Sequence, residues 1–371
     1  MKILFLTNIP SPYRVDFFNE LGKLCDLTVL FEKQIAQDRE KQWFEEKATS
    51  YRAVFLHGIP VGSDSSLCFP VLKYLREEWD IIIVGGYSTP TGLLAVQYLN
   101  TKKIPFILNC DGGTTKQESK LQYKIKKHFI SSAVGWLSPG ETTDTYLLHY
   151  GADSRYIFRY HFTSVRQDKI LDKPLSVEEK SLWKKQLSIT ENRAIISVGR
   201  FIESKGFDIL LDACRKFDRE IGIYIIGGKA TPEYKQYVDQ HHLTHVHFIE
   251  FKTKSELAPY YMAADLFVLP TRKDVWGLVI NEAMSFGVPV ITTDQCVAGL
   301  ELIKNGQNGY IVPSNDPMAL SEKIIEVLND YALTRKMMYN NLYKISEYTI
   351  EKMAQQHMEI FKPVSYTHLR A

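Results

Sequence analysis

The chain has 371 residues, 45% of them hydrophobic, which is enough to bury two cores of ordinary size. Its 45 basic and 43 acidic residues leave a formal net charge of +2, so no strong basic field indicates a nucleic-acid partner. The five cysteines are widely scattered and form no C-x-x-C pair, which argues against a zinc site or a disulfide framework and fits a reducing cytoplasm.

The first part of the chain alternates between strand and helix patterns. Residues 2–8 form an apolar run that predicts a strand, and Ser11 and Pro12 predict the N-cap and first residue of a helix. Further strands are predicted at 27–31, 53–56, 81–84, 104–109 and 135–137, and helices at 69–78 and 91–100. This order predicts a Rossmann-like, doubly wound parallel sheet over residues 1–165.

A second strand and helix series follows a polar segment, residues 160–179, where we expect the hinge. Strands are predicted at 193–198, 221–226, 245–249, 266–269 and 288–291, and helices at 207–217, 233–242, 255–263 and 317–328. The series predicts a second Rossmann-like domain over residues 166–345. We expect a C-terminal helix over 346–362 and a tail without periodicity over 363–371.

The stretch from Asp265 to Ile291 reads as a buried strand, a polar loop, an amphipathic helix and a second buried strand. A helical wheel places Asn281, Glu282 and Ser285 on one narrow polar stripe. Short polar groups with one carboxylate favour a face turned towards a cleft. An ordinary solvent-exposed face explains the spacing equally well.

Two basic residues, Arg200 and Lys205, lie between the first strand of the second series and the helix that follows it. Open α/β sheets bind ligands in this region, so both side chains could point at a diphosphate. The helix that begins near Gly277 would add unpaired backbone N–H groups and the positive end of its dipole. Solvated loop charges are the alternative explanation for the two basic residues.

The segment from Asp274 to Val290 has the sequence DVWGLVINEAMSFGVPV, which resembles the E-x7-E signature of glycosyltransferase family 4. The segment from Ser197, SVGRFIESKG, resembles the VGRxxxxKG segment of the same family. Family 4 comprises retaining nucleotide-sugar transferases of the GT-B fold. The chain departs from the pattern at Asp274, where the family usually has Glu, and the Asp side chain is one methylene shorter.

The resemblance implies two Rossmann-like domains facing one another across a cleft, with the last helix crossing back onto the first domain. It implies that Glu282 bonds the donor ribose, Asp274 touches the transferred sugar, and Arg200 and Lys205 stabilise the leaving diphosphate. Further donor contacts are expected from Gly199, Gly277, Leu278 and Val279. No D-x-D sequence occurs, so we expect catalysis without a metal and without a cofactor.

The first domain carries candidate residues for the acceptor side in loops that follow its strands. Ser11, Tyr13 and Arg14 lie where many family members have glycines, and Tyr87 follows a Gly-Gly pair. Asp111 ends another strand and resembles the place where the family puts a His or Asp near the sugar, which makes it a catalytic candidate. A helix cap with exposed side chains, a Gly-Gly turn and an Asp-Gly turn are the respective alternatives.

Residues 116–128 form a basic helical pattern in which Leu121 and Ile125 lie four residues apart. Such a helix could lie on anionic lipid, and a merely solvated helix is the other reading. No apolar run approaches the ~20 residues of a membrane span, so we expect a cytoplasmic protein, peripheral at the inner face of the membrane. The histidines at 241, 242, 245 and 247 favour a solvent-facing helix end and strand start over a metal site.

The expected function is the transfer of a sugar from a UDP- or GDP-sugar to a saccharide or lipid-linked acceptor, with retention and without metal. The setting would be the synthesis of a cell-surface polysaccharide or glycolipid. Another GT-B activity, such as a sugar-nucleotide epimerase, is one alternative. A nucleotide-sugar-binding subunit without catalysis is another, motivated by Asp274 in place of Glu.

Overall fold

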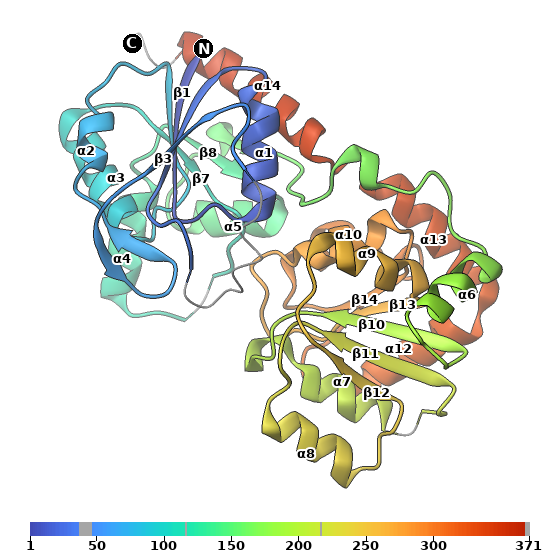
Figure 1. Ribbon diagram of the computed structural model, residues 1–371. Helices are drawn as coiled ribbons and strands as arrows, with labels where there is room; N and C mark the ends of the chain where they lie inside the picture. The colour runs from blue at the N-terminus through green and yellow to red at the C-terminus, as the bar shows by residue number, and fades with distance from the viewer. Residues whose placement is uncertain (37–46, 116, 216, 368–371) are drawn as a thin grey trace. The chain divides into compact units, whose positions relative to one another are not determined.

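The computed structural model describes residues 1–36, 47–115, 117–215 and 217–367. The chain divides into two compact units (Figure 1), which are Met1–Ser164 with Tyr348–Ala371, and Val165–Glu347. Each unit is built around its own parallel sheet. None of the helices in the described part of the chain combines the length and apolar character that a membrane span requires.

The first unit contains a seven-stranded sheet in the order β3-β2-β1-β6-β7-β8-β9, with every pair parallel. The strands are β1 (Lys2–Thr7), β2 (Asp26–Phe31), β3 (Arg52–Phe55), β6 (Ile81–Val84), β7 (Ile107–Asn109), β8 (Gly135–Ser138) and β9 (Ile157–Arg159). The chain runs outward from β1 in both directions, so the strand order reverses between β1 and β6, where such sheets bind ligands. Sequence patterns did not predict β9 or the small hairpin β4 (Ile59–Val61) and β5 (Ser65–Leu67).

The α-helices among the described residues of this unit are α1 (Pro12–Gly22), α2 (Val71–Tyr74), α3 (Pro90–Lys102), α4 (Lys120–Ile130), α5 (Glu141–His149) and α14 (Ile350–Thr367). As expected, α1 has Ser11 at its N-cap and a proline in its first turn, although the Ser11 side chain makes no capping hydrogen bond. Helix α14 lies alongside α1 (Figure 1), and the rings of Phe17 and His357 are 4.6 Å apart. It runs to Thr367, past the start of the tail expected at residue 363.

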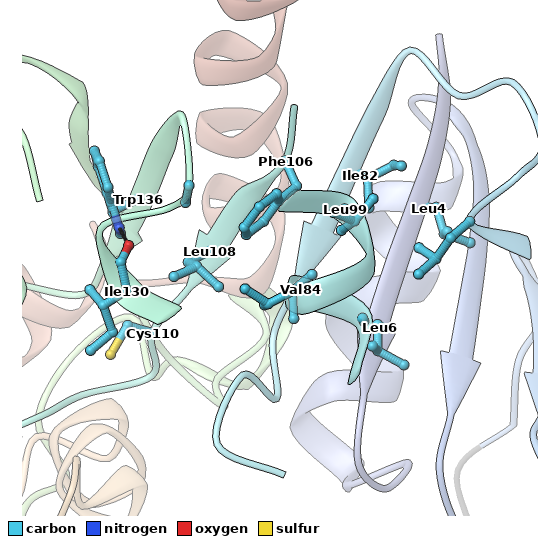
Figure 2. Packing of buried hydrophobic residues seen from close by; sticks show 14 of the residues in the cluster. Leu4, Leu6, Ile82, Val84, Leu99, Phe106, Leu108, Cys110, Ile130 and Trp136 are labelled. Atoms are coloured by element: carbon cyan, nitrogen blue, oxygen red, sulfur yellow. Dashed lines mark hydrogen bonds between the residues drawn. The ribbon is translucent and has the colours of Figure 1, made fainter. Parts of the chain in front are cut away.

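The core of the first unit follows from the period-two alternation of its strands. Leu4 and Leu6 of β1 belong to the same buried cluster as Val84 of β6 and Leu108 of β7 (Figure 2). Phe5 lies between them in sequence and packs edge-on against Phe18 of α1, with ring centroids 4.9 Å apart. Both faces of β1 are therefore buried, which is why the strand reads as a continuous apolar run.

The second unit contains a six-stranded parallel sheet in the order β12-β11-β10-β13-β14-β15. The strands are β10 (Arg193–Val198), β11 (Ile221–Ile226), β12 (Val246–Ile249), β13 (Leu266–Leu269), β14 (Val290–Thr293) and β15 (Gly309–Val312). Here the strand order reverses between β10 and β13. All of these strands except β15 were predicted from apolar runs in the sequence.

The helices of the second unit are α6 (Val177–Gln186), α7 (Phe207–Cys214), α8 (Pro232–Gln240), α9 (Lys254–Ala263), α10 (Leu278–Ser285), α11 (Val297–Leu302), α12 (Pro317–Asn329) and α13 (Tyr331–Ile345). Helix α6 begins inside the segment expected to be the hinge, because Ser176 and Glu179 form a capping box. The units divide between Ser164 and Val165 and again at Tyr348, so α14 follows α13 in sequence but belongs to the first unit.

Candidate functional site

Two loops meet at the carboxyl ends of β10 and β13, the neighbouring strands between which the order of the second sheet reverses. The carbonyl of Ser204 accepts hydrogen bonds from Thr271 Oγ1 at 2.7 Å and from the Arg272 N–H at 2.8 Å. Gly206 has a φ of +66°, and a Cβ there would lie 2.1 Å from the carbonyl oxygen of Pro270. A glycine is therefore required where these loops approach.

Lys205 and Asp274 contact each other across these loops. Lys205 Nζ lies 2.5 Å from Asp274 Oδ2, and the two side chains are 18% and 15% exposed. The Asp274 N–H donates to Gln295 O at 2.9 Å, which fixes its loop to the segment after β14. An ammonium group carries three N–H donors, so Lys205 can bond a further acceptor while it holds Asp274. Two residues predicted from separate motifs thus form one charged pair.

Helix α10 begins beside this pair, with Gly277 as its N-cap. The glycine has a φ of +103°, and a Cβ there would lie 2.7 Å from Cys296 Sγ and 3.7 Å from Asp274 Cγ. No side chain caps the N-terminus of α10, so the first N–H groups of the helix have no side-chain acceptor. The positive end of the helix dipole therefore lies near the Lys205 ammonium, in an arrangement suited to an anion.

The polar stripe predicted on α10 faces inward. Asn281 is fully buried and accepts a 3.0 Å hydrogen bond from Trp276 Nε1, while Ser285 is buried and donates to Glu282 O at 2.7 Å. The ordinary solvent-exposed reading of this stripe is therefore wrong. Glu282 is partly buried and accepts a 3.2 Å hydrogen bond from Tyr261 OH. Burial and the Glu282 charge raise the pKa of Tyr261 well above its ordinary value, so this hydroxyl remains a donor.

Gly199 and Arg200 directly follow β10 and open the same loop as Lys205. A Cβ on Gly199 would lie 3.4 Å from Lys205 Cδ, and one on Gly227 would lie 1.9 Å from Gly199 O. The glycine pair after β11, which lacks a dinucleotide-binding spacing, thus allows close approach of two loop backbones. Arg200 is partly buried in this loop.

Sequence reasoning missed Arg272, which stabilises the same loops. Its guanidinium pairs with Asp208 of α7, donates to Glu203 O at 2.9 Å, and donates to Asn315 Oδ1 at 2.7 Å. The only available signal was a basic residue two positions before Asp274. These contacts give Arg272 a role in holding the loop that carries Asp274.

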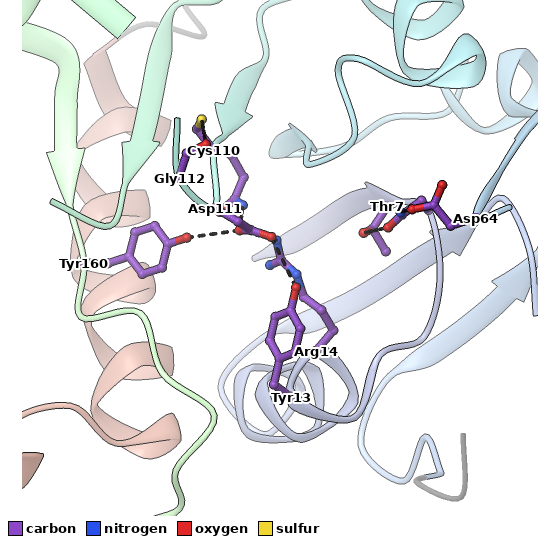
Figure 3. A network of polar contacts seen from close by, with 10 residues as sticks. Thr7, Tyr13, Arg14, Asp64, Cys110, Asp111, Gly112 and Tyr160 are labelled. Atoms are coloured by element: carbon purple, nitrogen blue, oxygen red, sulfur yellow. Dashed lines mark hydrogen bonds and ion pairs between the residues drawn. The ribbon is translucent and has the colours of Figure 1, made fainter. Parts of the chain in front are cut away.

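In the first unit, Asp111 and Arg14 form the centre of a polar network (Figure 3). The guanidinium of Arg14 contacts both carboxylate oxygens of Asp111, which also accepts from Asn109 Nδ2 at 2.7 Å, Tyr160 OH at 3.3 Å and Tyr13 OH at 3.4 Å. The Arg14 side chain is 4% exposed. Although burial lowers the pKa of Arg14, the charge of Asp111 raises it above its ordinary value. These contacts hold the Arg14 guanidinium and the Asp111 carboxylate together within the first unit.

The remaining acceptor-side candidates are also held by protein contacts. Ser11 is buried, so the exposed helix cap considered from the sequence does not occur. The hydroxyls of Tyr87 and Tyr146 are 2.8 Å apart. Glu32, which sequence reasoning passed over, follows β2 and is 1% exposed. It accepts from the Ser66 N–H and Thr89 Oγ1, and burial raises its pKa to about 7.

The histidines near β12 do not all face solvent, contrary to expectation. His245 is 5% exposed, and His247 Nε2 lies 2.6 Å from Glu191 Oε1. Among the residues that the structure describes, no group of three or more His, Cys, Asp or Glu side chains is placed to hold a metal ion.

The two doubly wound parallel sheets define the chain as a GT-B protein, and the comparison with solved structures shows the same fold. Anabaena HepE in complex with UDP and glucose matches with a TM-score of 0.76 and 19% identity, covering 98% of this chain and 100% of that chain. Residues 179–344 match the family of glycosyl transferases group 1. This match lies within the second unit, which therefore carries a domain of the group 1 glycosyl transferase family.

Two relatives extend this result. An uncharacterized glycosyltransferase of Methanocaldococcus jannaschii is 24% identical over 339 residues, which cover 85% of this chain and 86% of the relative. The capsular polysaccharide biosynthesis glycosyltransferase CapM of Staphylococcus aureus is 28% identical over 161 residues, which cover 42% of each chain.

Proposed function

We propose that this glycosyltransferase moves a sugar from a UDP- or GDP-sugar to a saccharide or lipid-linked acceptor, with retention of configuration, as family 4 enzymes do. The observation that carries the proposal is the Lys205 and Asp274 pair beside the uncapped N-terminus of α10. A cation about 4 Å from a phosphate oxygen contributes on the order of 4 kcal/mol before desolvation costs. The helix N-terminus adds roughly 0.3–1 kcal/mol.

In this proposal Lys205 and Arg200 stabilise the negative charge that grows on the departing diphosphate. Asp274 contacts hydroxyls of the transferred sugar and keeps Lys205 in place, while Glu282 bonds the ribose. Gly199, Gly277, Leu278 and Val279 complete the donor site through backbone contacts. The acceptor hydroxyl attacks from the face that the leaving group departs from and passes its proton to a phosphate oxygen. No side chain is then needed as a general base.

The donor and acceptor classes rest on the comparisons. HepE was solved with UDP and glucose, and the name of CapM places it in capsular polysaccharide synthesis. We extend both to this chain, with a nucleoside diphosphate sugar as donor and a cell-surface saccharide or glycolipid as product. No metal or cofactor takes part in the proposed reaction, since the sequence contains no D-x-D.

The test is incubation of the purified protein with labelled UDP- and GDP-sugars and a panel of saccharide and lipid-linked acceptors. We expect transfer or slow donor hydrolysis that persists in EDTA and falls in Lys205→Ala. The matched control is Lys235→Gln, an exposed lysine of α8. Isomerised donor without transfer would instead indicate an epimerase. Tight binding of UDP or GDP without turnover on any acceptor would indicate a binding subunit.

We also propose that α4 of the first unit docks this cytoplasmic protein on the anionic inner face of a membrane. The outward face of the helix carries Leu121, which is 68% exposed, and Ile125, which is 47% exposed. Lys120 and Lys124 lie on the same face, and both are exposed. Two aliphatic side chains between exposed lysines fit the boundary between lipid headgroups and acyl chains.

Vesicle sedimentation tests this docking. We expect binding to vesicles that contain phosphatidylglycerol, little binding to pure phosphatidylcholine, and loss of binding in Leu121→Ser/Ile125→Ser. The control is Leu182→Ser, because Leu182 of α6 is also 68% exposed but lies in the other unit. Equal binding by the α4 variant and the control would refute the docking surface.

A further inference from the structure

A hollow lies in the second unit, at the end of the sheet away from the candidate donor site. It has a volume of about 470 Å³ and is lined by α6, by residues 188–193 and by Asp265, which precedes β13. The candidate site follows the carboxyl end of β10, whereas this hollow is lined by Arg193, at which β10 begins. The six residues of β10 separate the two places by roughly 20 Å. The hollow therefore belongs to neither the Lys205 loop nor α10.

Two of the lysines that line the hollow share one carboxylate. Lys184 Nζ lies 2.6 Å from Asp265 Oδ2, and Lys180 Nζ lies 3.9 Å from Asp265 Oδ1. Both lysine side chains are largely buried, at 10% exposed for Lys180 and 12% for Lys184. Their other acceptors are neutral carbonyls, since Lys180 donates to Ala264 O and Lys184 to Asn192 O, each at 2.7 Å. One of the two buried positive charges is therefore left without a countercharge.

Two exposed basic residues add to the positive charge of the hollow. Lys185 and Arg193 line the hollow and are exposed, and neither forms an ion pair with any residue that the structure describes. Glu191 carries the other carboxylate of the lining, but both of its oxygens have partners outside the hollow. Oε2 accepts a hydrogen bond from Tyr224 OH at 2.6 Å, and Oε1 lies 2.6 Å from His247 Nε2. Four cations thus face two carboxylates, one of which is engaged away from the lysines.

The excess of positive charge around the hollow affects the pKa of Lys180. Burial lowers the pKa of Lys180, Asp265 opposes that effect, and the positive charges of Lys184 and Arg193 lower the pKa further. Uncompensated buried charge is costly in a protein, and an anion placed between these side chains would offset it. The geometry and the charge balance both favour a negatively charged occupant.

We propose that this hollow binds a phosphorylated sugar, with the phosphate against Lys180, Lys184 and Arg193 and the hydroxyls against the polar wall. The wall carries the short polar side chains of Ser181, Thr190 and Asn192, which suit a polyhydroxylated molecule. The volume lies within the range of about 300–1,000 Å³ that small-molecule sites occupy, which leaves room for more than a bare phosphate. This second site goes beyond sugar transfer and does not depend on it.

Calorimetric titration tests the proposal, with glucose 6-phosphate as the probe and glucose and inorganic phosphate as comparison ligands at constant ionic strength. We expect glucose 6-phosphate to bind more tightly than either comparison ligand. Lys185→Gln/Arg193→Gln should weaken binding at least tenfold, and because both residues are exposed, the variant should keep its fold, as thermal unfolding would verify. Lys235→Gln should leave the Kd unchanged.

Lys205→Ala separates this hollow from the donor site, because it alters the donor site alone. We expect the Kd for glucose 6-phosphate to be the same in Lys205→Ala as in the wild type. Loss of binding in that variant would assign the ligand to the donor site and overturn the proposal. An unchanged Kd in Lys185→Gln/Arg193→Gln would also overturn it, as would equal binding of inorganic phosphate.

Discussion

Each unit places a cation and a carboxylate where parallel strands end, and the two pairs differ in what surrounds them. Arg14 is 4% exposed, and its partner Asp111 also accepts hydrogen bonds from Asn109, Tyr13 and Tyr160. Lys205 is 18% exposed, and its ammonium retains donor capacity beside an uncapped helix. The first pair has its bonds made within the protein, whereas the second can accept an anionic ligand.

The comparison shows that residue type and position after a strand do not by themselves define a site. Arg14 and Asp111 both follow strands at the ligand-binding end of a doubly wound sheet, as Lys205 and Asp274 do. The number of internal partners and the exposure of the cation distinguish the two pairs. We therefore expect the first pair to contribute mainly to stability, and the proposed function places the second pair at the donor.

Arg14→Met should produce the largest effect. Removing one partner of a largely buried ion pair leaves Asp111 without its countercharge, so we expect a loss of about 3 kcal/mol in the free energy of unfolding. Urea denaturation measures this loss, and Arg14→Met/Asp111→Asn should recover part of it. A loss below about 1 kcal/mol, accompanied by a large fall in turnover, would instead indicate that Arg14 acts at the acceptor site.

The titration of His357 reports how well water is excluded from the part of the first unit that contains Arg14. It is 1% exposed among the rings of Phe17, Tyr160 and Phe361, and burial lowers its pKa to about 3. As the pH falls below about 6.5, His357 becomes protonated in the unfolded chain but stays neutral in the folded protein until the pH nears 3. Protonation therefore stabilises the unfolded chain, and the free energy of unfolding decreases over this pH range. Between pH 7 and 5 the loss is about 2 kcal/mol.

His357→Phe should remove this part of the pH dependence. Urea denaturation of the wild type and the variant at both pH values gives the difference directly. The wild type should lose about 2 kcal/mol more than the variant on acidification from pH 7 to 5. Equal losses in the two proteins would show that His357 is solvated or already charged in the folded state.

Lys205→Ala should affect turnover and leave the fold intact. We expect kcat to fall tenfold or more, which corresponds to about 1.4 kcal/mol of transition-state stabilisation. Stability should fall by less than in Arg14→Met, because Lys205 contacts one carboxylate oxygen of Asp274, whereas Arg14 contacts both oxygens of Asp111. Unchanged turnover would refute the role of Lys205 at the leaving group. A collapse in stability would make this pair an anchor like that of Arg14.

Asp274→Glu should give the smallest effect. Asp274 already reaches Lys205 at 2.5 Å, so the longer Glu side chain supplies no missing ion pair. We expect turnover within about threefold of the wild type, or less than 1 kcal/mol. Initial rates with the preferred donor measure it. Activity that appears only in Asp274→Glu would instead support a binding subunit whose catalysis was lost with the Glu.

The sheets could be predicted because their strands are buried on both faces. The β10 run from Arg193 to Val198 and the β6 run from Ile81 to Val84 have the predicted bounds. The hairpin β4 and β5 was missed because Ile59 and Val61 are exposed and a proline lies between them. Exposed short strands carry little periodic signal.

The two loops that carry Lys205 and Asp274 could be singled out from the sequence because each motif is contiguous. The contact between the two residues required the fold. The network around Asp111 could not be predicted, because Arg14 and Asp111 are 97 residues apart and each is explained locally by a turn or a helix cap. The burial of Asn281 could not be predicted either, because a helical wheel shows which residues share a face of the helix but not whether another element packs against that face.

The most direct test is a crystal structure of the protein with UDP. We expect the diphosphate to lie within about 3 Å of Lys205 Nζ and of the N–H groups that open α10. A diphosphate ordered elsewhere, with the contact between Lys205 and Asp274 unchanged and no ligand at the α10 N-terminus, would contradict it.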